Sequence, residues 1–314
     1  MNILKQPRAV VICGPTGVGK TGAAIRLAQL FGGEILGADS MQIYRKMDIG
    51  TAKPTPAERA AVPHHLIDIV DPDTPFDAKQ YAALAYDAVC RLDKHRVTPL
   101  VVGGTGLYIK SLIHGLFDSR PPDPDLRRRL RNTAREEGPG RLYERLRRCD
   151  PETARRLHPN DTYRVLRALE VYHSTGSPLS QYQQQHRFAA RRIRVLKIGL
   201  RLERQALYDR IDRRVDAMME QGLKAEVTSL LSAGYSADLK PMQAIGYRHM
   251  AAVIQGRLDA AEALRTFKRD TRRYAKRQLT WFGADDDIFW HAPDDLATIE
   301  ARIAAFLDHP KNVR

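Results

Sequence analysis

The sequence predicts an α/β fold in which a parallel sheet is flanked by helices and interrupted by an all-helical domain. Apolar runs at 9–13, at the start of 98–110 and at 194–200 read as buried strands, each followed by a turn and a helical pattern. Helical periodicity alone fills residues 126 to about 185. Because a strand pattern returns after that stretch, the helical segment is expected to be an insertion within the sheet domain.

The first glycine-rich turn has the pattern of a P-loop, G-x-x-x-x-G-K-[ST]. The pattern is filled by Gly14, Pro15, Thr16, Gly17, Val18, Gly19, Lys20 and Thr21. An expected strand precedes it and an expected helix, 22–30, follows, so the backbone N–H groups and the helix N-terminus can face an anion. Lys20 is expected to contact a terminal phosphate, and Thr21 to bind Mg²⁺. The sheet domain is therefore expected to be P-loop NTPase-like, while the loop alone leaves the phosphate compound open.

Size and composition restrict the class of protein. At 314 residues the chain exceeds one typical domain. No apolar run approaches the roughly 20 residues that a membrane helix needs, and the first strand begins too soon for a cleavable signal. Cys13, Cys90 and Cys149 have neither an even count nor metal-binding spacing, so they are expected to be reduced. We expect a cytoplasmic protein with no membrane segment, and a monomer by default.

Positive charge is concentrated in one part of the chain. The net charge is +14 and the isoelectric point is near 9.8. Residues 120–194 hold 18 arginines, no lysine and nine acidic residues, a net charge of +9 against +5 for the rest. This asymmetry favours a dedicated surface for nucleic acid over a uniformly cationic protein.

The second expected strand, within 33–40, delivers Asp39 at its carboxyl end. Ligands of open α/β sheets bind outside the carboxyl ends of the strands, so topology places Asp39 near the phosphate loop. The carboxylate could cap the next turn, as is common for Asp-Ser. It could instead act as a general base or orient a nucleophile. We favour the second interpretation, because polar residues and Tyr44 follow directly.

Residues 47–54 are expected to form a loop, 63–72 to contain a third short strand, and 76–92 to form a helix. The adjacent His64 and His65 raise the possibility of a metal site. No third ligand follows at suitable spacing, so a structural or substrate-lining role is expected for the pair.

A second glycine-rich turn, Gly103 to Gly106, follows the strand pattern that begins at Thr98 and precedes another helix. It lacks the P-loop lysine. Because it opens at the same edge of the sheet as the P-loop, it is expected to bring the Thr105 hydroxyl to the same crevice as Asp39. A turn selected only for its backbone geometry is the alternative.

Prolines after Asp118 indicate a domain boundary. We expect residues 118–194 to be an inserted arginine-rich helical domain, and 1–117 with 195–314 to be the catalytic core. Apolar residues of the insertion that could form a small core are Leu126, Leu130, Leu142, Leu146, Leu157, Val165, Leu166, Leu169 and Val171. The arginines on the opposite faces are either solvated or, as the lack of lysine favours, used to recognise phosphates and bases.

The C-terminal third is expected to add helices, two of them in 204–231 with a break at Gly222. On the first, Arg210, Arg213 and Arg214 could place a cation near the phosphates or could simply lie on the surface. Residues 265–282 combine seven basic residues with aromatic ones, which is typical of single-stranded RNA binding. An amphipathic helix that buries Leu279 and Trp281 is the competing interpretation.

Taken together, six blocks resemble the tRNA dimethylallyltransferase (tRNA isopentenyltransferase) family. They are 14–21, 39–44 (DSMQIY), 50–54 (GTAKP), 103–106 (GGTG), 243–248 (QAIGYR) and 277–282 (RQLTWF). The blocks span nearly the whole chain in the family's order. Eukaryotic members carry a C-terminal zinc finger that this sequence lacks, so the resemblance is to the bacterial type.

The resemblance implies transfer of a dimethylallyl group from dimethylallyl diphosphate to N6 of adenosine 37, beside the tRNA anticodon, with release of diphosphate. It implies Arg214 as a further diphosphate contact, Asp39 and Thr105 as catalytic residues that also contact tRNA, and Mg²⁺ as cofactor. Ser40, Met41 and Gln42 would line the base pocket. Further tRNA contacts implied by the resemblance are Arg127, Tyr163, Arg164, Val165, Leu166, Arg167, Gln243, Gly246, Tyr247, Arg248, Lys276, Arg277, Gln278 and Trp281.

Two other functions are compatible with parts of the sequence. A P-loop nucleoside or nucleotide kinase also places a carboxylate after its second strand, but it leaves the arginine-rich insertion unexplained. A non-catalytic RNA-binding protein would explain the insertion, but the intact Lys20 and Thr21 argue against it.

Overall fold

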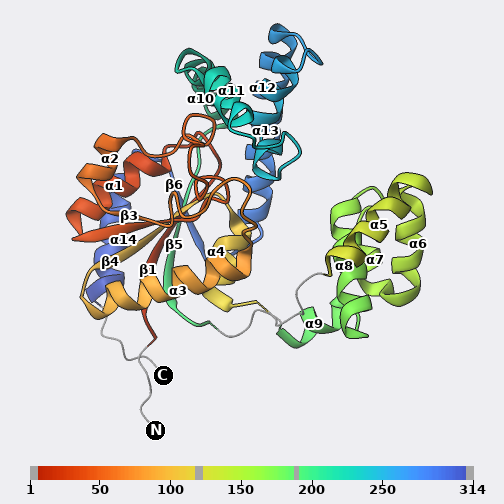
Figure 1. Cartoon of the computed structure of the whole chain (residues 1–314). Coiled ribbons are helices and arrows are strands. Elements are labelled where there is room, and N and C mark those ends of the chain that lie inside the picture. The colour runs from red at the N-terminus through yellow and green to blue at the C-terminus, as the bar shows by residue number, and fades with distance from the viewer. Residues whose placement is uncertain (1–5, 117–122, 187–190, 309–314) are drawn as a thin grey trace. The chain divides into compact units, whose positions relative to one another are not determined.

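The structure is a computed structural model that describes residues 6–116, 123–186 and 191–308. These residues form one six-stranded parallel sheet with strand order β3-β2-β4-β1-β5-β6, surrounded by helices (Figure 1). The strands are β1 (Arg8–Cys13), β2 (Gly33–Gly37), β3 (His64–His65), β4 (Thr98–Gly103), β5 (Arg194–Leu200) and β6 (Ile288–His291). The P-loop follows the central strand β1, while Asp39 and Thr105 follow β2 and β4.

Helices cover both faces of the sheet. Along β1, Val11 packs in one apolar cluster with Tyr81 of α3 (Ala78–Lys94), whereas Val10 packs in another with Leu27 of α1 (Lys20–Leu30). Both valines are fully buried. Successive side chains of a strand point to opposite faces, so a strand covered on both sides needs apolar residues at every position. This explains the unbroken apolar run at 9–13.

The remaining helices of this part carry the functional loops or brace them. They are α2 (Pro56–Ala61), α4 (Gly106–His114), α10 (Arg204–Glu220), α11 (Leu223–Ser232), the 3₁₀ helix η1 (Pro241–Gln243), α12 (Tyr247–Ile254), α13 (Ala260–Phe282) and α14 (Leu296–Asp308). Several begin at side-chain caps. Asp77 accepts from the backbone of α3, and Asp259 accepts from the backbone of α13. The break between α10 and α11 lies at Gly222, whose φ is 96°.

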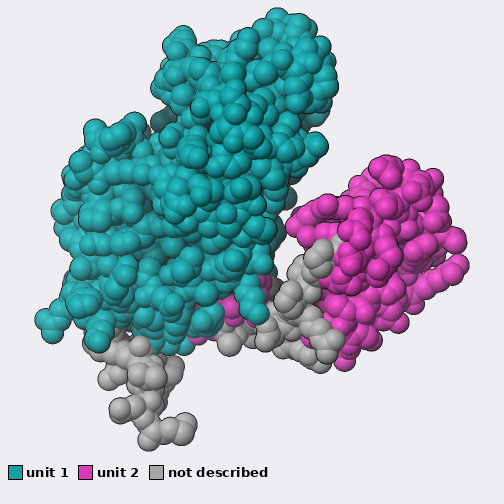
Figure 2. All heavy atoms as spheres, in the orientation of Figure 1, with its two compact units in different colours: residues 1–113, 192–314 teal, residues 114–191 magenta. Residues whose placement is uncertain are grey.

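The chain divides into two compact units, residues 1–113 with 192–314 and residues 114–191 (Figure 2). Among its described residues the second unit contains helices and no strand. Its helices are α5 (Pro124–Glu136), α6 (Pro139–Cys149), α7 (Pro151–Arg156), α8 (Thr162–Thr175) and α9 (Leu179–His186). Leu142, Leu146 and Val165 are fully buried in its apolar core. Asp150 caps both α7 and α9, accepting from the amides of Thr153 and Ser180.

The expected parallel sheet flanked by helices, with an inserted helical segment, is confirmed. The first helix begins at Lys20 rather than residue 22, and the expected third strand is only two residues long. We did not predict α2, β6 or α14. The expected boundary at residue 118 lies in 117–122, outside the described residues, as do the N-terminal residues 1–5. None of the helices described has the length and apolar character needed to cross a bilayer.

Candidate active site

The P-loop adopts a conformation that depends on its glycines. Gly14, Gly17 and Gly19 have φ values of 142°, 81° and 103°, which residues with a side chain rarely adopt. At Gly14 a Cβ would also lie 2.5 Å from the carbonyl oxygen of Leu200 on β5. Because α1 begins at Lys20, the lysine and Thr21 belong to the first helical turn, where N–H groups are unpaired and the helix dipole is positive.

Lys20 lies in a strongly cationic environment. Its Nζ donates to the carbonyl oxygens of Gly14 at 3.0 Å and Pro15 at 2.7 Å. Burial, and then the nearby Arg214, lower the pKa of Lys20 to about 8. Burial also lowers the pKa of Arg214, whose guanidinium lies 3.5 Å from the hydroxyl of Thr16. Because Lys20 and Arg214 are two buried cations close to each other beside the P-loop, a bound anion would be favourable there.

Asp39 and Thr105 are joined by a short network at the same edge of the sheet. Oδ1 of Asp39 accepts from the amide of Met41 at 2.8 Å, so this oxygen caps the following turn. The hydroxyl of Thr105 accepts from the amide of Ser40 at 3.0 Å, and its own amide donates to Ala38 at 3.1 Å. The capping bond proposed as one interpretation of Asp39 is therefore present, and it leaves Oδ2 to be accounted for.

A cavity of about 140 Å³ joins the P-loop to this network. Its polar lining comes from Thr16, Lys20, Thr21, Asp39, Gln42, Thr51, His64, Arg214, Tyr274 and Gln278. The structure thus brings together the P-loop and Asp39, as topology predicted, and it places Arg214 beside them. Thr105 follows the lining residue Gly103 on the adjoining turn.

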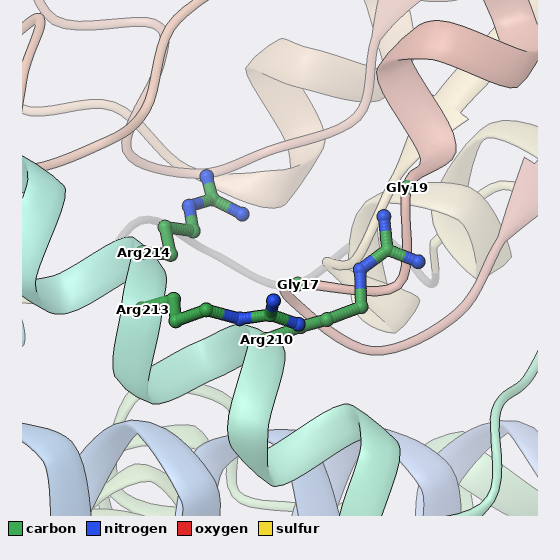
Figure 3. Close-up of a pocket in the computed structure, with 5 residues that line it drawn as sticks. All are labelled: Gly17, Gly19, Arg210, Arg213 and Arg214. Atoms are coloured by element: carbon green, nitrogen blue, oxygen red, sulfur yellow. The ribbon is translucent and has the colours of Figure 1, made fainter.

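A second hollow, of about 330 Å³, lies beside the P-loop and is lined by Gly17, Gly19, Arg210, Arg213 and Arg214. Figure 3 shows the three arginines on α10 beside the loop that carries the two glycines. Gly17, Gly19 and Arg214 line both spaces. Of the two interpretations of this arginine group, the structure therefore supports placement beside the loop expected to hold phosphate.

Tyr274 was not predicted to be a cavity residue. It comes from α13, and burial, followed by the charge of Asp39, raises the pKa of its hydroxyl. The sequence suggested only a stacking aromatic among basic residues. The spacing could have indicated this position, because Tyr274 lies one helical turn before Gln278, which lines the same cavity.

Residues of α11 and α12 contact the loop 47–54 and stabilise it. Glu226 accepts from the amides of Asp48, Ile49 and Gly50, and from the hydroxyl of Tyr247 at 2.6 Å. A Cβ at Gly50 would lie 2.4 Å from the ring of Tyr247.

This contact explains why the 50–54 and 243–248 blocks occur together. The first block packs on the second. Tyr247 is fully buried, so its side chain supports the loop from inside the protein.

The loop in turn positions Gln42, whose amide nitrogen donates to the carbonyl oxygens of Thr51 and Ala52, both at 3.1 Å. Lys53 is buried and pairs with Asp48 and Asp68, each at 2.6 Å. One wall of the cavity is therefore fixed by polar contacts that join the loop to Gln42 and Asp68.

Helix α13 is less cationic at its surface than its sequence indicates. Lys268 pairs with Asp216 and Arg272 with Asp212, both on α10, while Arg265 pairs with Glu262 on its own helix. Near the C-terminal end, Lys276 and Arg277 are exposed.

The aromatic end of α13 lies against the second glycine-rich turn. Trp281 is 43% exposed, and a Cβ at Gly106 would lie 2.0 Å from its Nε1. Trp281 is therefore not buried as the amphipathic-helix alternative required. A side chain at Gly106 would collide with the Trp281 ring, which explains the glycine at this position.

The expected tRNA contacts near α12 occupy different environments. Gly246 and Tyr247 are buried, whereas Gln243 is exposed and donates to the carbonyl of Ala237. Arg248 pairs with Asp270 on α13 at 2.5 Å.

In the helical unit, Val165 is in the core and Leu166 packs against it. Arg127 forms a two-pronged ion pair with the buried Glu170, which Arg167 also approaches. Tyr163 is 71% exposed, and Arg164 is exposed beside Asp161. Tyr163 and Arg164 are therefore the members of this group whose side chains are presented to solvent.

The histidine pair has other partners. Nδ1 of His64 lies 2.7 Å from the carbonyl oxygen of Val62, and Nε2 of His65 lies 2.6 Å from Glu34. Among the described residues no three His, Cys, Asp or Glu side chains form a metal-binding group. Cys13, Cys90 and Cys149 are free thiols.

The sequence matches the family model described as IPP transferase over residues 42–285. It is 54% identical over 285 residues to the tRNA dimethylallyltransferase of Desulfosudis oleivorans, covering 91% of each chain. It is 52% identical to tRNA dimethylallyltransferase 1 of Pelobacter propionicus, covering 96% of this chain and 98% of that one.

Solved structures agree. The full-length tRNA isopentenylpyrophosphate transferase of Bacillus halodurans superposes with a TM-score of 0.71 at 40% identity, covering 97% of each chain. A eukaryotic dimethylallyltransferase acting on tRNA superposes with a TM-score of 0.78 at 29% identity, covering 96% of this chain and 77% of that one. The fold is P-loop NTPase-like, as the sequence predicted.

Proposed function

Because the chain belongs to the IPP transferase family, we propose that it transfers a dimethylallyl group from dimethylallyl diphosphate to N6 of adenosine 37 in the tRNA anticodon loop. Diphosphate is the second product. The observation that carries the proposal is the single cavity lined by the P-loop, Arg214 and Asp39, because it offers an anion cradle and a proton acceptor to one reaction.

The cationic side of the cavity stabilises the leaving group. Lys20, Arg214 and the backbone N–H groups at the start of α1 face the diphosphate and offset the charge that develops as the allylic C–O bond breaks. An allylic cation is delocalised, so neutralising the leaving group is the main requirement for ionisation.

Mg²⁺ fits this cradle as an ion that the protein and the diphosphate would bind together. The hydroxyl of Thr21 lines the cavity and is the kind of hard oxygen donor that Mg²⁺ prefers. The described residues offer no group of three His, Cys, Asp or Glu side chains for a metal, so diphosphate oxygens and water would supply most of its ligands. When bound, the ion supplies further neutralisation of the diphosphate.

Asp39 acts on the acceptor. The N6 amine attacks the allylic carbon, the new C–N bond replaces the C–O bond to diphosphate, and the surplus N6 proton passes to the Asp39 carboxylate. Oδ1 is fixed by the amide of Met41, which orients the carboxyl group and directs Oδ2 to the amine. Thr105 holds the Ser40 amide and thereby the loop that carries the carboxylate.

Gln42 lines the cavity, and we propose that Ser40 and Met41, which precede it in the chain, complete the wall of the base pocket. An adenine stacked within the anticodon loop has to be swung out to reach this cavity, as base-modifying enzymes require. The helical unit 114–191, through its exposed Tyr163 and Arg164, contacts the tRNA backbone and neighbouring bases, as do the exposed Lys276 and Arg277 of α13.

The kinase and RNA-binding alternatives are not supported by the relatives, all of which carry the name of a tRNA prenyl transferase in the comparisons above. The test is an assay with labelled dimethylallyl diphosphate and unmodified tRNA. Label in tRNA with stoichiometric diphosphate release supports the proposal. Intact protein that transfers no label, and instead phosphorylates a small acceptor from ATP, contradicts it.

A further inference from the structure

Gln278 on α13 lies between the two glycine-rich loops of the active site. It is 5% exposed. Its Oε1 accepts from the amide of Thr16 in the P-loop at 2.8 Å, and its Nε2 donates to the carbonyl oxygen of Gly104 at 2.9 Å. The Gln278 side chain therefore links two loops that are distant from it and from each other in the sequence.

The two contacts can be made only by an amide in this orientation. A glutamine has one acceptor end and one donor end, and here an N–H faces the first and a carbonyl faces the second. The fit is also close, because a Cβ at Gly104 would lie 2.1 Å from Nε2. The Gly104 position and the Gln278 side chain are thus matched in shape and in hydrogen bonding.

The Gly103–Gly106 turn continues this connection toward Asp39. The Thr105 amide donates to Ala38, and the Ser40 amide donates to the Thr105 hydroxyl. Ala38 and Ser40 are the two neighbours of Asp39 in the chain. The position of Asp39 relative to the P-loop therefore depends on a path that runs through Gln278.

We infer that Gln278 is a positioning residue, which fixes the distance between the diphosphate cradle and the residues that receive the nucleophile, and that it does not contact tRNA. The inference rests on the proposed function. Transfer between two bound substrates is sensitive to displacements of about 1 Å, which can cost a hundredfold in rate. A residue that links the diphosphate-binding loop to the loop beside Asp39 is therefore expected to affect turnover more than the affinity for either substrate.

Gln278→Met tests this inference because methionine has similar length but forms neither bond. Gln278→Glu is a second variant, since it keeps an acceptor for Thr16 and places an oxygen against the Gly104 carbonyl. Thr280→Ala, two residues further along α13 on its exposed face, is the matched control. Each protein is assayed for kcat, for KM of dimethylallyl diphosphate, for the Kd of tRNA, and for amide hydrogen exchange.

We expect Gln278→Met to lower kcat by about tenfold to a hundredfold, with the Kd of tRNA within about twofold of the wild type. Amide exchange should accelerate in both 14–21 and 103–106. In Gln278→Glu, the acceleration should be greater in 103–106 than in 14–21. Thr280→Ala should match the wild type in every measurement.

An unchanged kcat with a tRNA Kd raised fivefold or more would instead make Gln278 an RNA contact and overturn the inference. An unchanged exchange rate in either loop would also overturn it. Should the wild type fail to transfer the prenyl group at all, the proposed function fails, but the exchange data still decide whether Gln278 couples the two loops.

Discussion

Arg127 donates two hydrogen bonds to the carboxylate of Glu170, linking α5 to α8 in the helical unit. The carboxylate is 1% exposed, and Arg167 approaches it from its own helix. The ion pair raises the pKa of Arg127 through the bond to Glu170. The guanidinium that the family resemblance assigned to tRNA is therefore engaged in holding two helices together.

Replacing Arg127 should reduce the stability of the helical unit. Arg127→Ala leaves a buried carboxylate with a weaker partner, and the expected loss is about 2 kcal/mol of unfolding free energy. Urea unfolding followed by far-UV circular dichroism measures it. Arg128→Ala, which removes only the exposed pair with Asp125, should change stability by less than about 0.5 kcal/mol. Equal effects of the two variants would contradict the structural role of Arg127.

Tyr163 should show the opposite behaviour. Its ring is largely exposed, so Tyr163→Ala should leave unfolding unchanged. If it stacks on a base of the anticodon arm, the variant should weaken tRNA binding by about 1–3 kcal/mol, measured by filter binding at fixed salt. Unchanged affinity would remove Tyr163 from the interface.

Asp39→Asn separates the two roles of Asp39. The asparagine oxygen can still accept from the Met41 amide, so the turn remains capped, but the side chain no longer takes a proton. If Asp39 is the base, single-turnover transfer should slow on the order of a hundredfold in Asp39→Asn. A rate within threefold of the wild type, together with a large loss in Asp39→Ala, would leave only the capping role.

The affinity for a prenyl diphosphate analogue should fall as pH rises above about 8. The pKa of Lys20 is lowered to about 8 by burial and by Arg214, so its ammonium is charged below that pH and increasingly neutral above it. The anion then loses one attractive charge. Calorimetric titration from pH 6.5 to about 9.5 measures the effect. Lys20→Arg, which keeps its charge throughout, should lack the Lys20-dependent fall, and identical profiles would contradict this explanation.

Glu226→Ala should loosen the loop 47–54. The variant removes the acceptor of three backbone N–H groups and of the Tyr247 hydroxyl, and the expected loss is about 2 kcal/mol of stability. Hydrogen exchange should accelerate at residues 48–50. Thr228→Ala, on the exposed side of α11, is the control and should change neither quantity. Unchanged protection at 48–50 would show that the loop does not depend on Glu226.

Much of the site could be predicted because parallel sheets bring the carboxyl ends of their strands to one edge. The common location of the P-loop, Asp39 and the 103–106 turn could be predicted because each of them directly follows a parallel strand. The partners of Gln278 could not be predicted, because its bond to Thr16 joins residues 262 positions apart and depends on the orientation of one amide. The same applies to Arg127, whose partner lies 43 positions away.

Two elements of the fold were missed for local reasons. Strand β6 is four residues long, and its apolar run of Ile288, Phe289 and Trp290 is shorter than the runs that identify a buried strand. It pairs with β5 at the edge of the sheet. Helix α2 has no buried residue, and the signals that could have revealed it are its capping box at Thr55 and Glu58 and the proline at its first position, Pro56.

The central claim is that one cavity brings an allylic diphosphate and a tRNA adenosine together. Nucleoside mass spectrometry of tRNA from cells with and without this protein tests it most directly. The account predicts that N6-(dimethylallyl)adenosine at position 37 disappears with the protein and returns with the wild type but not with Asp39→Ala. A tRNA nucleoside profile that is the same in the presence and absence of the protein would contradict the account.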